Sequence, residues 1–294
     1  MARNVNVALF EPNDKFREKL KKSLESLPIK TTLSIAKNEA ELSKLIAEKP
    51  FDLVIIDYKA ADPKGDRLVE ILKFKSKANQ IKKVLVTAIH LNEAGKPTEI
   101  GDIPLTFVSK PFRPEILEST LISILEIDAP LKSPNWKLDA RLLNPFIEAL
   151  LENCSEGVRL DLKKKSVDLK KKEDLCDLSV TSIFDKGDLF GAFSVGFPDK
   201  TFLEFSKKIS KTEDRSIHQK NIFVAEEFLN STIKKIKVAL ESRKMNLSFR
   251  SPVVTIGKGH LAPTIQGLKP ILIKFESDEG LRLQIELSLQ KNQS

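Results

Sequence analysis

Four polar side chains follow short apolar runs in the first part of the chain, where strands of a parallel sheet would end. They are two carboxylates, a hydroxyl and an ammonium, on Glu11, Asp57, Thr87 and Lys110. Because the carboxyl ends of parallel strands meet at one edge of a sheet, we expect these side chains to converge on a crevice. Such a set could bind a divalent cation and a phosphoryl group.

A second candidate pair lies in a long helical stretch, 219–242. Its apolar residues recur at helical spacing and predict a buried stripe of Ile222, Ala225, Leu229, Ile233, Ile236 and Leu240. Glu227 and Asn230, about 60° apart around the axis, share a face away from that stripe. The carboxylate could pair with a lysine of another protein, and the carboxamide could orient a water for attack. A Glu-x-x-Asn spacing alone is also typical of an ordinary exposed helix.

The elements that must position these residues fall into two patterns. Residues 1–127 alternate strand-like and helical stretches, which predicts an α/β doubly wound five-stranded parallel sheet. The predicted helices are 14–27, 39–47, 65–74 and 114–125, with a short or broken helix in 91–101. Residues 128–138 contain two prolines and predict a linker. Residues 139–294 predict a C-terminal α+β domain, with helices at 139–153, 200–210 and 219–242 and strands at 158–169, 175–184, 189–195, 246–256, 271–276 and 281–289.

Composition excludes several classes of protein. The 294 residues are 41% apolar and 31% charged, which is ordinary for globular domains and unlike a disordered or disulfide-stapled chain. Only Cys154 and Cys176 occur, the start does not resemble a signal peptide, and no run of about 18 apolar residues is present. We therefore expect a cytoplasmic protein with no membrane partner.

The net charge is +8, and part of the basic excess lies in Lys163–Lys165 and Lys170–Lys172. These lysines could form a patch for nucleic acid or an acidic protein. Few aromatic residues or arginines accompany them, which favours a solvated, lysine-rich strand edge. No recognition helix is evident, so we expect no nucleic-acid partner.

Residues 1–126 resemble a response-regulator receiver domain of the CheY type. The resemblance is carried by FDLVIIDYKAADPKGD, VLVTA and FVSKPF. It implies that Asp57 is the phosphoacceptor, that Lys110 pairs with phosphoryl oxygens, that Thr87 and Phe107 are the switch residues, and that Mg²⁺ binds at Glu11 and Asp57. Receivers usually have a second acid after the first strand, and here that position is Pro12, which weakens the expected magnesium site.

Residues 139–294 resemble the CheX-like members of the CheC/CheX/FliY family of receiver phosphatases, on the segments LDARLLNPFIEALLE, AEEFLN and SPVVTIGKGH. The resemblance implies a two-component, chemotaxis-type protein that dephosphorylates a CheY-like response regulator. Glu227 would engage the target's lysine, and Asn230 would hold the attacking water. It also implies a homodimer through this domain and a histidine kinase as a possible partner. Lys234 and Lys235 depart from the small residues common after the Asn.

Alternatives to this reading stay open at this point. The second domain could act on Asp57 of the same protein, in cis or within a dimer. The chain could instead be a non-enzymatic dimerising adaptor with a degenerate pseudo-receiver.

His260 could in principle bind a metal ion. It has no other histidine and no suitably spaced cysteine near it in sequence, so we interpret it as a structural loop residue rather than a metal ligand.

Overall fold

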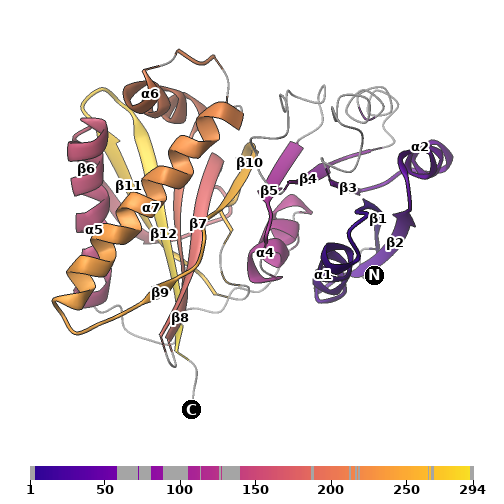
Figure 1. Cartoon of the computed structure of the whole chain (residues 1–294), viewed down its shortest axis with the longest axis horizontal. Coiled ribbons are helices and arrows are strands. Elements are labelled where there is room, and N and C mark those ends of the chain that lie inside the picture. Colours follow the sequence, from indigo (N-terminus) through magenta and orange to yellow (C-terminus); the bar gives the residue numbers. More distant parts are fainter. Residues whose placement is uncertain are drawn as a thin grey trace. The chain divides into compact units, whose positions relative to one another are not determined.

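The computed structural model describes residues 4–57, 72, 81–88, 105–112, 114–125, 127, 140–186, 189–211, 213–215, 217, 219–263, 265 and 268–291. The chain divides into two compact units, one of residues 1–129, 218–220 and 255–260 and the other of 130–217, 221–254 and 261–294 (Figure 1). The predicted helices at 65–74 and 91–101, apart from Leu72, and the predicted linker 128–138 lie outside the described residues.

The first unit contains a parallel sheet. Its strands pair in the order β2 (Lys30–Ala36), β1 (Asn4–Phe10), β3 (Leu53–Asp57), β4 (Val84–Ala88) and β5 (Leu105–Ser109), each parallel to its neighbour. The described helices are α1 (Asp14–Glu25), α2 (Glu39–Glu48) and α4 (Pro114–Ile124). The prediction of a parallel α/β fold for this part of the chain is confirmed.

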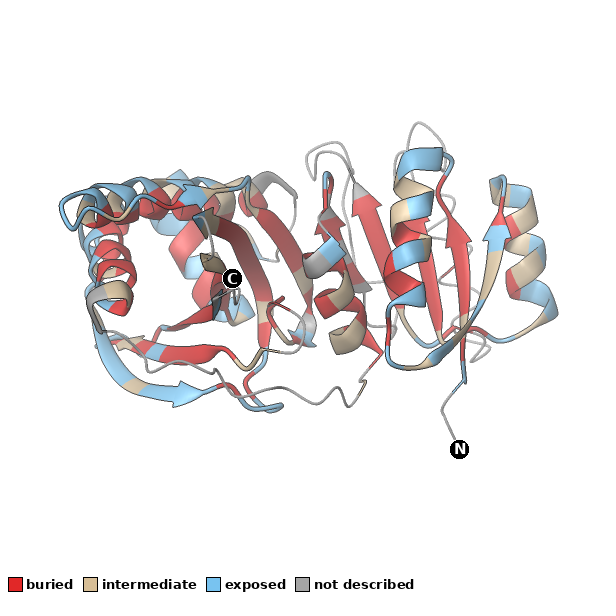
Figure 2. Cartoon of the chain, turned by 90° about the horizontal axis from the view of Figure 1, so that it is seen from below, coloured by how far each residue is buried: buried red, intermediate tan, exposed pale blue. Residues whose placement is uncertain are grey.

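Local sequence explains these elements. Every residue of β3 is buried, which is why its sequence LVIID is almost continuously apolar. Helix α1 begins where the Asn13 side chain accepts a hydrogen bond from the Phe16 N–H, and it buries Leu20 and Leu24. Figure 2 shows that buried residues fill most of the inner strands of this unit, whereas exposed residues gather on its helices.

The second unit is built on antiparallel strands. They pair in the order β7 (Cys176–Lys186), β8 (Leu189–Phe197), β12 (Arg282–Lys291), β11 (Ile271–Ser277) and β6 (Leu162–Leu169), and β9 (Ser248–Phe249) also pairs with β7. β10 comprises Val253–His260, and its residues 255–260 belong to the first unit. The helices are α5 (Ala140–Asn153), α6 (Asp199–Ser210) and α7 (Gln219–Glu241). The α+β prediction is confirmed.

Phenylalanine rings join the helices of this unit to its strands. The Phe146 ring of α5 lies 5.1 Å from the ring of Phe193 on β8. The Phe228 ring of α7 lies 4.7 Å from that of Phe205 on α6 and 6.4 Å from that of Phe197 on β8. This apolar layer holds α7 against the sheet, since aromatic contacts add to the free energy gained from burial.

Two predicted strands were wrong at their boundaries. The strand predicted at 158–169 begins only at Leu162, because a π-helical turn, Cys154–Val158, extends α5 and Arg159 then takes a left-handed conformation with φ 56°. The strand predicted at 246–256 is divided into β9 and β10. The division falls next to Pro252, which has no N–H to donate to a neighbouring strand.

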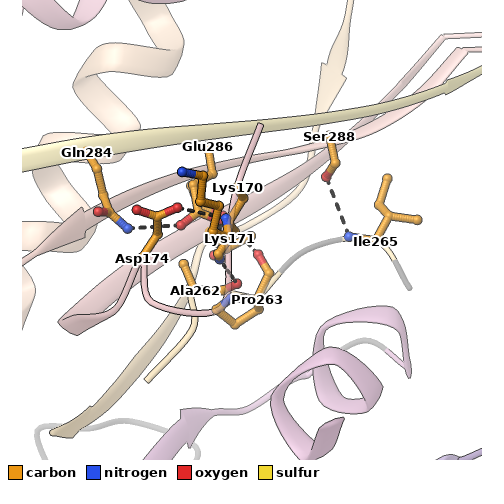
Figure 3. A network of polar contacts seen from close by, with 11 residues as sticks. Lys170, Lys171, Asp174, Ala262, Pro263, Ile265, Gln284, Glu286 and Ser288 are labelled. Atoms are coloured by element: carbon orange, nitrogen blue, oxygen red, sulfur yellow. Dashed lines mark hydrogen bonds and ion pairs between the residues drawn. The ribbon is translucent and has the colours of Figure 1, made fainter. Parts of the chain in front are cut away.

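The two lysine runs behave differently. Lys163, Lys164 and Lys165 are exposed on β6, which lies at an end of the strand order, so the solvated-edge interpretation holds for them. It was wrong for Lys170, which is 5% exposed. The Lys170 ammonium pairs with the buried carboxylate of Glu286 and donates to the Ala262 carbonyl at 3.0 Å (Figure 3). The Gln284 amide donates to the other Glu286 oxygen at 3.0 Å, and burial raises the pKa of Glu286.

Among the described residues, no helix combines the length and apolar character needed to cross a membrane.

Replacing one partner of the buried pair should destabilise the second unit. Lys170→Met leaves the Glu286 carboxylate buried without its ammonium, and we expect the free energy of unfolding to fall by about 3–5 kcal/mol. The double variant Lys170→Met/Glu286→Leu should recover most of that loss. The measurement is urea unfolding, with Lys164→Met on exposed β6 as the control. Equal stability of Lys170→Met and Lys164→Met would contradict the prediction.

Candidate functional site

Acidic and basic side chains gather where strands of the first unit end, and we call this edge of the sheet the acidic crevice. Glu11 follows β1, Asp57 ends β3 and Lys110 follows β5. The Lys110 Nζ lies 2.6 Å from Glu11 Oε2 and 3.1 Å from Asp57 Oδ1. The structure therefore brings the two carboxylates and the ammonium of the predicted set together, although 99 residues separate Glu11 from Lys110.

The Lys110 side chain is held from several sides. It is 1% exposed, and its Nζ lies 4.7 Å from the centroid of the Phe16 ring. That ring packs on Phe112 at 5.6 Å between centroids. An ammonium over an aromatic face is attracted by the ring quadrupole, so α1 helps to position the lysine beside both carboxylates.

Thr87 and Phe107 occupy neighbouring strands at the same edge. Thr87 is fully buried and is the parallel partner of Asp57, and its hydroxyl donates to the Ile56 carbonyl at 3.4 Å. Phe107 is the strand partner of Val86 on β4. Its side chain lies outside the described part of the structure, and its switch role stays a prediction.

The donor set of the crevice suits a cation held by two carboxylates. Glu11 Oε1 accepts the Asn13 N–H at 3.0 Å, and Oε2 faces the ammonium that also contacts Asp57. Pro12 supplies no side-chain oxygen, and Asp14 pairs with Arg17 on the exposed side of α1. Mg²⁺ commonly takes one or two carboxylates together with waters and phosphate oxygens, so Glu11 and Asp57 fit this minimum.

The charge balance of the crevice is set by burial. Desolvation raises the pKa of Glu11, and the adjacent Lys110 ammonium opposes that shift. Within the described residues, no cluster of three or more His, Cys, Asp or Glu side chains could hold a metal ion. Any ion in the crevice would therefore need its remaining ligands from water or phosphate.

The second candidate pair lies on α7. Glu227 and Asn230 are exposed, whereas Phe228 and Leu229 between them are 4% and 0% exposed. Every residue of the predicted apolar stripe is buried, from Ile222 to Leu240. The stripe faces the interior of the unit and turns the carboxylate and the carboxamide outward on one side of a stiff helix.

A polar contact between α5 and α7 lies directly behind this pair. The Asn153 amide nitrogen donates to the Phe228 carbonyl at 3.1 Å and to Thr232 Oγ1 at 2.9 Å. The Ser231 hydroxyl donates to Asn153 Oδ1 at 3.0 Å. Asn153 itself is 5% exposed. Because these bonds are directional, they define which side of α7 faces α5 more sharply than apolar packing does.

Ion pairs extend the same contact toward solvent. The Lys235 ammonium pairs with Glu152 at the end of α5 and lies 2.7 Å from Glu156 in the π-helical turn. We call Asn153, Glu152 and Glu156, with their α7 partners Ser231, Thr232, Lys235 and the Phe228 carbonyl, the α5–α7 polar seam. Sequence reasoning missed it, because nothing local to Asn153 indicates a partner 75 residues away.

His260 was predicted to lie in a loop, and that placement was wrong, because it is the last residue of strand β10. It is 7% exposed, and its Nδ1 lies 2.7 Å from the Gly257 carbonyl oxygen, a contact within β10.

Comparison with known proteins gives structural similarity at low sequence identity. No family model and no curated protein matches the chain. A CheC-like superfamily protein from Shewanella sp. PV-4 is 23% identical over 52% of this chain and 99% of its own, with a TM-score of 0.49. The chemotaxis protein CheX from Vibrio vulnificus is 22% identical over 51% of this chain and 100% of its own, with a TM-score of 0.48.

A further match covers a smaller share of the chain. A signal receiver domain of a two-component histidine kinase from Clostridium thermocellum is 17% identical over 42% of this chain and 98% of its own, with a TM-score of 0.35. At these identities the similarity concerns the fold alone.

Removing the Asn153 amide should destabilise the second unit. Asn153→Ala leaves Ser231 without its acceptor and takes a donor from the Phe228 carbonyl, and we expect a loss of about 2 kcal/mol. Chemical unfolding measures it. The matched control is Asn144→Ala, an exposed asparagine of the same helix, which should change stability by less than about 0.5 kcal/mol. A similar loss in both variants would show that the seam contributes nothing particular.

Proposed function

We propose that this chain is a two-component signalling protein whose second unit hydrolyses the aspartyl phosphate of a CheY-like response regulator. The observation that carries the proposal is the exposure of Glu227 and Asn230 on either side of buried Phe228 and Leu229. A pair presented on a rigid, convex helix can enter a crevice on another protein. Its residue types suit that crevice, which holds a lysine and a phosphorylated aspartate.

In the proposed reaction, each α7 residue has one task. The Glu227 carboxylate pairs with the target's lysine and sets the orientation of the helix in the crevice. The Asn230 carboxamide accepts a hydrogen bond from one water molecule and aims its oxygen at phosphorus, opposite the aspartate. The water oxygen bonds to phosphorus as the bond from phosphorus to the aspartyl oxygen breaks. The electron pair of that bond returns to the carboxylate, and the water's proton passes to solvent.

The first unit is proposed to be a receiver that regulates the second. Asp57 would accept the phosphoryl group, Lys110 would pair with its oxygens, and Thr87 and Phe107 would respond to it. Glu11 and Asp57 would hold Mg²⁺, which supplies positive charge to the phosphoryl oxygens when bound. A histidine kinase is the corresponding phosphoryl donor, and we expect a homodimer through the second unit, as the sequence resemblance implies.

One observation favours a second candidate, a non-enzymatic adaptor with a pseudo-receiver. Pro12 stands where a second acid is usual, and Lys110 already neutralises part of the charge of both remaining carboxylates. A crevice balanced in this way has less need of a cation. The following two experiments separate the two candidates.

Phosphorylation of the receiver is tested by incubating the full chain with acetyl phosphate and magnesium, followed by intact-mass measurement. We expect one added phosphoryl group in the wild type and none in Asp57→Asn, because the substituted amide cannot form the acyl phosphate. Chelation of magnesium should remove the adduct. An unmodified wild type under these conditions would favour the pseudo-receiver.

Phosphatase activity is tested by the decay of a phosphorylated CheY-type receiver. We expect the wild type to accelerate decay, and Asn230→Ala to lower the rate constant about 100-fold, the scale of one positioned transition-state group. Glu227→Ala should also lose activity because the helix is no longer oriented. Asn246→Ala, at an exposed asparagine beyond α7, is the control and should keep full activity. Decay that is the same with and without the wild type would favour the adaptor.

A further inference from the structure

Lys234 lies on the same face of α7 as the proposed active pair. At about 100° per residue, it falls about 20° from Glu227 and about 40° from Asn230 around the axis, and about 6 Å beyond Asn230 along it. Side chains on a helix lean toward its N-terminus, so the Lys234 stem leans back toward Asn230. Lys234 is exposed, in common with both residues of the pair.

The neighbouring lysines of α7 are engaged within the unit. Lys235 pairs with Glu152 and Glu156 in the α5–α7 polar seam. The Lys237 Nζ lies 6.0 Å from the centroid of the Phe249 ring. For Lys234, no hydrogen bond, ion pair or ring contact is recorded within the described ranges of the chain. Its ammonium is thus available to a partner that docks on this face.

An ammonium at this position would offset negative charge when α7 docks on a phosphorylated receiver. A phosphorylated receiver crevice combines a dianionic phosphoryl group with the carboxylates that remain unmodified. In this chain's own crevice, Glu11 and Asp57 lie on either side of one lysine, and Glu11 would stay a carboxylate if Asp57 were phosphorylated. Docking the Glu227 carboxylate there adds another negative charge and engages the crevice lysine. A cation one helical turn from Asn230 would offset that repulsion.

We propose that Lys234 is a docking residue that pairs with anionic groups at the rim of the phosphorylated receiver's crevice. The proposal rests on the proposed function, because it takes the partner to be that receiver. Lys234 acts on association: it strengthens binding and makes it sensitive to salt, and it leaves the chemical step unchanged. This separates its role from that of Asn230.

The test measures binding and turnover side by side. The full chain is titrated by calorimetry with CheY-type receivers carrying beryllofluoride and magnesium, at 50 and 500 mM NaCl. Variants are Lys234→Met, Lys234→Glu and the control Lys200→Met, which removes the same charge from an exposed position on α6. Circular dichroism verifies that each variant is folded.

At low salt, we expect Lys234→Met to weaken binding roughly fivefold, and Lys234→Glu to weaken it further, while Lys200→Met binds like the wild type. The difference should shrink at high salt. In the decay assay, Lys234→Met should raise KM by a similar factor and leave kcat within about twofold.

The outcomes distinguish this proposal from the one on which it rests. Wild-type turnover with equal binding by Lys234→Met and Lys200→Met overturns the docking role and leaves the phosphatase intact. Binding weakened in Lys234→Met without any turnover supports the docking role and overturns the phosphatase. No binding of any receiver by the wild type overturns both. A drop in kcat in Lys234→Met without a change in binding would assign Lys234 to the chemical step and overturn the docking role.

Discussion

Burial of Phe228 and Leu229 between two exposed polar residues is the constraint on which the candidate active face depends. A rotation of α7 that exposed the Phe228 ring would forfeit about 1.5–3 kcal/mol of burial free energy and would carry a polar side chain into an aromatic layer. The contacts of Phe228 with Phe205 and Phe197 therefore fix the outward direction of Glu227 and Asn230.

The polar seam adds directional precision to that apolar constraint. Apolar side chains tolerate small slides and rotations, whereas the hydrogen bonds of Asn153 are satisfied in one relative position of α5 and α7. The π-helical turn after α5 places Glu156 beside Lys235. This ion pair continues the contact between α5 and α7 toward solvent. Such a support matters for the role proposed for Asn230, because small misplacements slow a positioned reaction greatly.

In the acidic crevice, two carboxylates lie close together and an ammonium compensates their negative charge. Glu11 and Asp57 are both nearly buried, and their shared ammonium is what makes their proximity tolerable. Pro12 removes one further carboxylate from the same place. Lys110 pairs with both Glu11 and Asp57, so the two carboxylates depend on this lysine for charge compensation.

Much of the fold and both candidate sites could be predicted from the sequence. Strand and helix periods alternate clearly in the first part, and the α7 stripe is regular enough to place Glu227 and Asn230 outward. Predictions were wrong at 158–169 and 246–256, where a π-helical turn and Pro252 set boundaries that apolar periodicity does not contain. Lys170 was assigned to a solvated edge because a run of lysines carries no local sign of burial.

The sequence by itself therefore determined how strand-like and helical stretches alternate along the chain, which face of α7 is apolar and which polar groups follow the strands. These are properties of residues that are neighbours in the sequence. Only the tertiary structure decided that Asn153 bonds to the Phe228 carbonyl, that Lys110 joins Glu11 to Asp57, and that Lys170 is buried against Glu286. Each of these contacts joins elements far apart in the chain, and its existence depends on how those elements pack together.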